Sequence, residues 1–243
     1  MTTLLEDAWE TYAKNIKLVL LFSIPFVIAF VIPLLAPLPT YVSGGAIFLR
    51  TASIFLNINA VGLAVIIISS FISLLFLSFA FVAISMIVKS ERTFTRNLAS
   101  AIRGIEKYTA RVFVVLLAYA LILVLVNILG YFLGLEGILT PVVGFFLFMA
   151  IFYAPTAIAI DNKSIGQALN RSLELVVERP QYFLLWVITL VFVLSVVDFV
   201  VIHATGTLLS SYIVLILNSL FILPYFVIFQ AEAYMRRFSI LKH

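Results

Sequence analysis

Six long apolar runs make up most of this sequence, and Asp198 is the only ionisable residue that interrupts one of them. A charged side chain in the middle of a membrane costs about 2.5–3.5 kcal/mol on insertion scales, so such a residue is a functional candidate by default. His203 follows shortly after it, and Asn127 and Asn218 fall inside two other runs. One interpretation is that Asp198, Asn127 and His203 line a polar cavity that opens outward, or bind a cation or a proton.

The same residues also have a structural interpretation. Asp198 lies near the predicted outer end of its run, where it could meet water or pair with Arg50 and fix the packing of helices. Asn127 and Asn218 could join neighbouring helices by hydrogen bonds, which contribute about 0.6 kcal/mol each on average in membranes. The sequence leaves both interpretations open.

No residue pattern typical of an enzyme is present. The chain has two histidines and no cysteine, which excludes thiol nucleophiles, disulfides and cysteine-based metal sites. It also lacks HExxH and GxSxG motifs, paired carboxylates inside the apolar runs, and a glycine-rich loop for phosphate. We therefore expect no enzyme activity, no cofactor and no metal site.

The composition indicates a protein of the membrane. Apolar residues make up 64% of the 243 residues and charged residues only 11%, whereas soluble domains have about half and about a quarter. A soluble fold of this size would have to expose much of that apolar surface to water. We expect one integral membrane domain over residues 1–243, and no nucleic-acid partner despite the net charge of +4.

The lengths of the apolar runs predict six spanning helices. A hydrocarbon core of about 30 Å takes roughly 20 apolar residues in helical form. The runs are continuous and do not alternate in polarity, which favours helices over strands. The predicted fold class is therefore all-α, a polytopic membrane protein with six transmembrane helices. The runs are residues 18–38, 58–88, 112–135, 137–160, 180–203 and 205–231.

The basic residues predict how the chain is oriented. Six spans would place all but one of the 15 lysines and arginines on one side, and Arg50 alone on the other. Because basic segments stay in the cytoplasm, we expect a multi-pass protein of the cell membrane with both termini cytoplasmic. The acidic N-terminus does not resemble a signal peptide, so the first run is expected to be retained. Six of the basic residues could also contact anionic lipid headgroups: Lys89, Arg92, Arg96, Arg103, Lys107 and Arg111.

The segments on the predicted cytoplasmic side resemble one another. Each contains an amphipathic stretch that leads into a span, and aligning Ala8, Ala101 and Ala168 places an apolar residue next in all three. Pro155 and Pro224 lie late in the second span of two units, where proline is expected to kink the helix. We predict three repeats of an amphipathic helix plus two spans, in units 2–88, 92–160 and 164–233.

The first unit differs from the other two in its outer connection. Residues 39–57 are long and still apolar, and residues 46–56 could form a helix in the membrane interface or a shallow re-entrant segment. We favour the interfacial helix.

Two stretches resemble a known family. FYAPTAIAIDNKSIGQALNRSLELVVERPQYFLLWVI (152–188) combines an aromatic-proline span end, an acidic residue and an Ala-x-x-x-Ser amphipathic helix that leads into the next span. Together with LLEDAWETYAKNIKLVLL (4–21), it is similar to a family of multipass prokaryotic membrane proteins of uncharacterised function. Relatives include the membrane domain attached to some glycerophosphoryl diester phosphodiesterases. The resemblance implies a fold and no phosphodiesterase activity, since that catalytic barrel alone takes about 250 residues.

Two classes of function remain. We favour a lipid-interacting structural or assembly protein whose partners are membrane lipids, with a homo-oligomer as an open option. The alternative is a channel or transporter with a polar path through Asp198, Asn127 and Asn218. Transport would require these side chains to line one cavity, whereas a structural role would bury each against a neighbouring helix.

Overall fold

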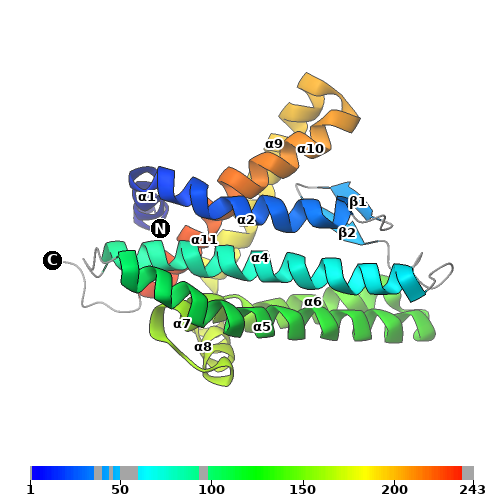
Figure 1. Ribbon diagram of the computed structural model, residues 1–243, viewed down its shortest axis with the longest axis horizontal. Coiled ribbons are helices and arrows are strands. Elements are labelled where there is room, and N and C mark those ends of the chain that lie inside the picture. Colours follow the sequence, from blue (N-terminus) through cyan, green and yellow to red (C-terminus); the bar gives the residue numbers. More distant parts are fainter. Residues whose placement is uncertain (1, 36–39, 44–45, 50–59, 93–97, 237–243) are drawn as a thin grey trace.

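The computed structural model describes residues 2–35, 40–43, 46–49, 60–92 and 98–236. Apart from one short hairpin and the connections between elements, these described residues are helical (Figure 1). The elements are α1 (Thr2–Lys14), α2 (Ile16–Leu35), β1 (Thr40–Ser43), β2 (Ala46–Leu49), α4 (Ala60–Arg92), α5 (Leu98–Leu133), α6 (Glu136–Ile151), α7 (Ala154–Asp161), α8 (Ile165–Glu178), α9 (Pro180–Thr205), α10 (Thr207–Leu217), the π-helical turn η1 (Asn218–Ile222) and α11 (Leu223–Met235).

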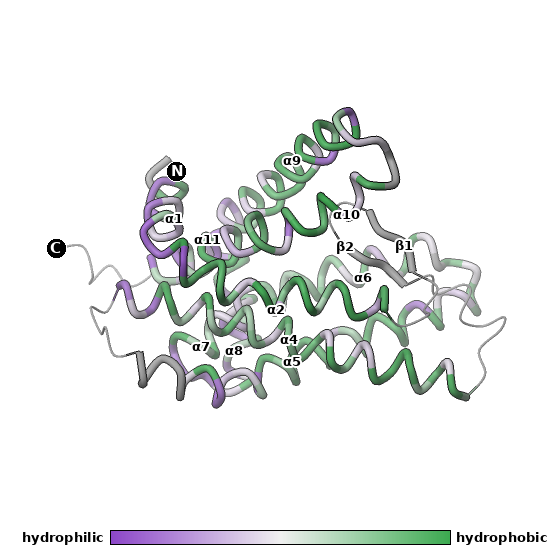
Figure 2. The backbone as a smooth tube through the Cα atoms, turned by 45° about the horizontal axis from the view of Figure 1, so that its top comes forward, coloured by the Kyte–Doolittle hydropathy of each residue, from purple (hydrophilic) through white to green (hydrophobic). Residues whose placement is uncertain are grey.

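Six helical segments of the described chain are long and apolar enough to cross a membrane, and each coincides with one predicted run. The all-α prediction with six such helices is therefore confirmed. Most residues of the long helices are hydrophobic, with hydrophilic residues mainly near the ends (Figure 2), as expected where lipid and not water surrounds a helix. The segments are Ile16–Leu35, Ala60–Arg92, Gly104–Leu133, Gly137–Asp161, Pro180–Thr205 and Leu209–Met235.

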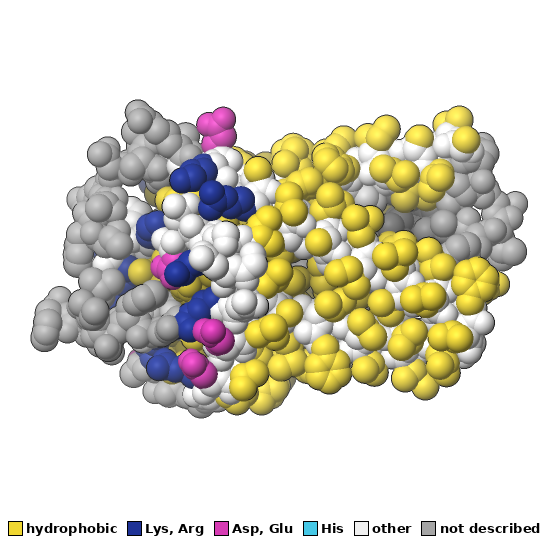
Figure 3. All heavy atoms as spheres, turned by 90° about the horizontal axis from the view of Figure 1, so that it is seen from below, with side chains coloured by type: hydrophobic (Ala, Val, Ile, Leu, Met, Phe, Trp, Pro, Cys, Tyr) yellow, Lys and Arg dark blue, Asp and Glu magenta, His cyan; other side chains and the backbone are white. Residues whose placement is uncertain are grey.

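The long helices form a layered bundle with a diverging arm. Helix α4 lies between α2 and α5, and α5 also contacts α6. Helices α9 and α10 pair with each other and point away from α4, α5 and α6 (Figures 1 and 2). Charged side chains gather at one end of the molecule (Figure 3), where α1, α8 and the last residues of α4 and α11 lie. We call this the charged end.

Both prolines of the predicted repeat coincide with interruptions in a helix. Pro155 lies in the first turn of α7, after a break at Phe152 and Tyr153, and Pro224 lies in the first turn of α11, which follows η1. A proline has no N–H to donate and its ring crowds the carbonyl four residues earlier, so the preceding turn breaks or widens. Both predicted positions therefore coincide with an irregular turn, whereas the kinks and the threefold repeat stay predictions.

The amphipathic segments differ in how they join the spans. Helices α1 and α8 are separate from the spans that follow them, but the middle segment continues without a break as the first turns of the 36-residue α5. At the start of α8, the N–H of Ser164 donates to Oε1 of Gln167 at 3.3 Å, which is one of the two hydrogen bonds of a capping box.

The predicted interfacial helix over residues 46–56 is wrong where the structure describes it. Residues 46–49 form strand β2, which pairs antiparallel with β1 and places Tyr41 opposite Phe48. Aromatic and β-branched residues flank the sequence Gly44-Gly45, and this pattern favours a two-residue hairpin over a helix. Residues 50–56 lie outside the described residues.

Candidate functional site at the charged end

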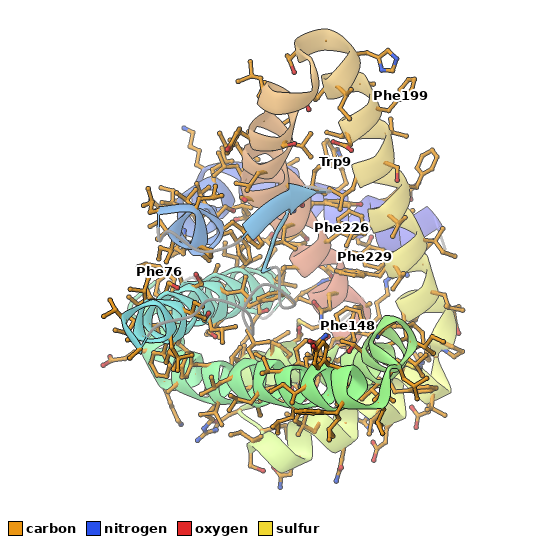
Figure 4. The ribbon with its side chains drawn as sticks, turned by 90° about the vertical axis from the view of Figure 1, so that its right-hand side faces the viewer. Trp9, Phe76, Phe148, Phe199, Phe226 and Phe229 are labelled. Carbon is orange, nitrogen blue, oxygen red and sulfur yellow. The ribbon has the colours of Figure 1, made fainter. Side chains whose placement is uncertain are left out.

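Asp198 and His203 lie on α9, away from the rest of the predicted polar site. Asp198 is half-buried and forms no hydrogen bond or ion pair with any described residue, and its suggested partner Arg50 lies outside the described part. The exposed His203 ring lies against that of Phe199 in a tilted arrangement, with 4.2 Å between centroids. Figure 4 shows Phe199 on the diverging arm, far from α5.

The two asparagines occupy other places. Nδ2 of Asn127, on α5, donates to Oγ1 of Thr140 on α6 at 3.3 Å, which is a contact between neighbouring spans. Asn218 is 5% exposed at the start of the π-helical turn. The four residues of the predicted polar site are therefore not brought together in the structure.

Three of the basic residues predicted to meet lipid headgroups bond to other parts of the protein, and two of them, Lys89 and Arg111, do so beside α7. Nζ of Lys89 donates to the backbone oxygen of Ile160 at 2.6 Å, and Nη1 of Arg111 donates to Oδ1 of Asn162 at 3.1 Å. Both contacts join α4 or α5 to the end of α7. Lipid contact by these side chains stays a prediction.

The other basic residues have different surroundings. Nζ of Lys107 lies 5.7 Å from the centroid of the Tyr108 ring. Arg96 and the side chain of Arg103 lie outside what the structure describes, and Arg92 belongs to the ion cluster considered next.

An ion cluster that the sequence did not reveal ties α1 and α11 to α4. The carboxylate of Glu232, on α11, has no solvent exposure and accepts hydrogen bonds from Nε and Nη2 of Arg92 at 2.9 and 2.5 Å. Oγ1 of Thr11, on α1, donates to the same carboxylate at 2.9 Å. Because a buried carboxylate is tolerated only when it is paired and hydrogen-bonded, this geometry fixes α1, α4 and α11 against one another.

Asp7 completes this cluster from α1. Its carboxylate accepts a hydrogen bond from Nη2 of Arg236 at 2.5 Å and lies 3.4 Å from Nη2 of Arg92. Burial raises the pKa of the Asp7 carboxyl, but the hydrogen bonds and charges of Arg236 and Arg92 outweigh burial and bring the pKa below its usual value. The cluster Asp7, Arg92, Glu232 and Arg236 is called the ion cluster below.

Polar side chains also bridge the interrupted helices. Nε2 of Gln230 donates to the backbone oxygen of Phe152, at the break between α6 and α7. The Tyr234 hydroxyl donates to Oδ2 of Asp161 at 2.6 Å. Gln230 therefore supplies a hydrogen-bond donor to a backbone carbonyl beside a helix break. That carbonyl would otherwise lack a partner inside the molecule.

A large groove opens beside the ion cluster, between α2, α4 and α5. Its volume is about 1150 Å³, above the roughly 300–1,000 Å³ of ordinary small-molecule pockets. The mouth at the charged end is polar, lined by Lys14, Asn15, Ser90, Glu91, Glu106 and Thr109.

Deeper in, the groove is apolar. Its walls there include Leu21 and Phe22 of α2 and Leu75, Phe76 and Phe79 of α4, and Figure 4 labels Phe76 at the α2–α4 side of the molecule. Along α4 the lining extends from Glu91 to Leu75, roughly 24 Å at 1.5 Å per residue. One leaflet of a bilayer is about 20 Å thick with its headgroups, so the groove has the length and the polarity of a single lipid.

None of the residues predicted as a polar site lines this groove. The sequence does show that Lys14, Glu91 and Glu106 each lie within two helical turns of a long apolar run. Their convergence depends on how three helices pack, which the sequence does not specify directly.

No protein-family model, curated protein or solved structure matches this chain.

Proposed function

We propose that this chain is a lipid-interacting structural protein of the cell membrane, and that the groove between α2, α4 and α5 holds one lipid molecule. The observation that carries the proposal is the change from a polar mouth at the charged end to an apolar interior about one leaflet deep. Lipid tails gain no hydrophobic free energy by leaving one apolar phase for another, so retention depends on packing in the groove and on polar contacts at its mouth.

The arrangement of polar residues favours this function over transport. A path for solutes would need polar side chains that converge near the middle of the membrane. Asn127 contacts Thr140, Asn218 is buried at the π-helical turn, and Asp198 lies on the diverging arm. The channel or transporter alternative therefore lacks a supporting contact among the described residues.

Filling the groove should reduce lipid retention. Ala110 lines the mouth and is exposed, so Ala110→Trp places an indole in the groove without overpacking the core. We expect the number of lipids that remain bound after detergent purification, measured by native mass spectrometry, to fall by about one per chain.

Ala118 provides the matched control, because it is an exposed alanine of the same helix that does not line the groove. Ala118→Trp should retain as much lipid as the wild type. Equal retention in wild type, Ala110→Trp and Ala118→Trp would rule out the groove as a lipid site.

We also propose that the charged end faces the cytoplasm, because basic segments are retained there. The chain has no cysteine, so single cysteines can be introduced without background labelling. Lys107→Cys and Glu178→Cys, at the charged end, should react with an impermeant maleimide only after cells are opened. Leu135→Cys, at the opposite end, should react in intact cells. Labelling of Lys107→Cys and Glu178→Cys from opposite sides would contradict the topology.

A further inference from the structure

The charges at the mouth of the groove specify a kind of headgroup. Lys14, at the end of α1, pairs with Glu91 of α4, and Glu106 of α5 lines the same mouth. Within the described part of the chain, no basic side chain pairs with Glu106. Among the described residues, the mouth therefore carries one cation and two carboxylates, an arrangement that complements a headgroup with both a phosphate and an ammonium group.

We infer that the groove selects a glycerophospholipid whose headgroup ends in a primary amine, as in phosphatidylethanolamine. This inference rests on the proposed lipid-binding function. The phosphate lies beside Nζ of Lys14, and the ammonium group donates hydrogen bonds to the carboxylates of Glu91 and Glu106. Such charge-assisted hydrogen bonds are stronger than those between neutral groups.

The same mouth disfavours the two other common headgroup classes. An anionic glycerol headgroup brings a negative charge toward two carboxylates without an ammonium group to offset it, and repulsion of this kind produces specificity. A choline headgroup has no N–H to donate, and proteins bind it with the faces of aromatic rings. No aromatic side chain belongs to the polar mouth among the residues described there.

The test compares headgroups on identical acyl chains. Purified protein is equilibrated with mixed micelles that contain equal amounts of phosphatidylethanolamine, phosphatidylglycerol and phosphatidylcholine, and the bound lipids are counted by native mass spectrometry. The wild type should retain phosphatidylethanolamine preferentially. Glu106→Gln should lower its ratio to phosphatidylglycerol by about fivefold, a modest effect because an exposed carboxylate is screened by solvent. Glu106→Lys should reverse the preference.

Glu178→Gln is the matched control, since Glu178 is an exposed carboxylate at the charged end that does not line the groove. It should leave the ratio unchanged. Equal retention of the three lipids by the wild type, or a ratio insensitive to Glu106→Gln and Glu106→Lys, would overturn the headgroup inference. If Ala110→Trp still lowers the retention of all three, the groove remains a lipid site. If Ala110→Trp changes nothing, the proposed function fails as well.

Discussion

Replacing Glu232 by alanine is expected to lower the free energy of unfolding by about 3 kcal/mol, at the lower end of the range for breaking a buried ion pair. Glu232 has no solvent exposure and accepts hydrogen bonds from Arg92 and Thr11. Its loss leaves the Arg92 guanidinium partly buried, with Asp7 at 3.4 Å as its remaining acidic partner. The lower end of the range applies because the Arg92 side chain is 24% exposed and water can solvate part of its charge.

The measurement is an unfolding titration with sodium dodecyl sulfate in mixed micelles, followed by tryptophan fluorescence. Thr11→Val should lower the free energy of unfolding by less, about 1 kcal/mol, since it removes one hydrogen bond and leaves the ion pair in place. A double-mutant cycle that combines Glu232→Ala with Arg92→Ala should show that the two decreases in the free energy of unfolding are not additive.

Glu174 provides the control for this prediction. It pairs with Arg171 three residues earlier on α8, but its side chain is 54% exposed. Exposed ion pairs contribute about 0–1 kcal/mol, so Glu174→Ala should scarcely change the unfolding midpoint. A Glu232→Ala variant as stable as Glu174→Ala would show that the ion cluster does not hold the charged end together.

Replacing Trp186 by alanine should be the second most damaging single change. Trp186 and Phe183 are the buried residues of α9, so they fix the start of the diverging arm to the bundle. The Trp186 ring lies 5.1 Å from that of Phe152 and 5.5 Å from that of Phe226, centroid to centroid. Its Nε1 donates to the backbone oxygen of Phe226 at 2.8 Å.

Trp186→Ala should lower the free energy of unfolding by about 2 kcal/mol, below the 3–5 kcal/mol typical of tryptophan-to-alanine changes in soluble cores. Lipid tails are as apolar as the core, so the truncation loses packing contacts and creates a cavity but loses little transfer free energy. Trp186→Phe should cost about 1 kcal/mol, because it keeps most of the packing and loses the hydrogen bond.

Circular dichroism during the same detergent titration measures this loss without depending on the tryptophan signal. Phe192→Ala is the matched control on α9, since Phe192 is 67% exposed and faces the surrounding apolar phase. Its unfolding should match the wild type. A Trp186→Ala midpoint equal to that of Phe192→Ala would mean that α9 is held to the bundle by other contacts.

The sequence by itself determined the number, positions and helical nature of the long apolar segments. Each of these features is local: about 20 consecutive apolar residues must satisfy their own backbone hydrogen bonds in lipid, and a helix does so within the segment. The positions of the interruptions were also predictable, because Pro155 and Pro224 act on the turn directly before them. The hairpin was missed because a short apolar run fits a helix or a strand equally well.

Only the tertiary structure decided which side chains form a site. Glu232 meets Arg92 and Thr11 across 140 and 221 residues of sequence, and Lys14, Glu91 and Glu106 come from three helices that line one groove. Asp198 interrupts an apolar run, yet it belongs to α9, which diverges from α5, the helix that holds Asn127. Apolar spans can pack beside one another at many tilts and rotations with similar free energies, so composition and spacing do not select the neighbours that packing provides.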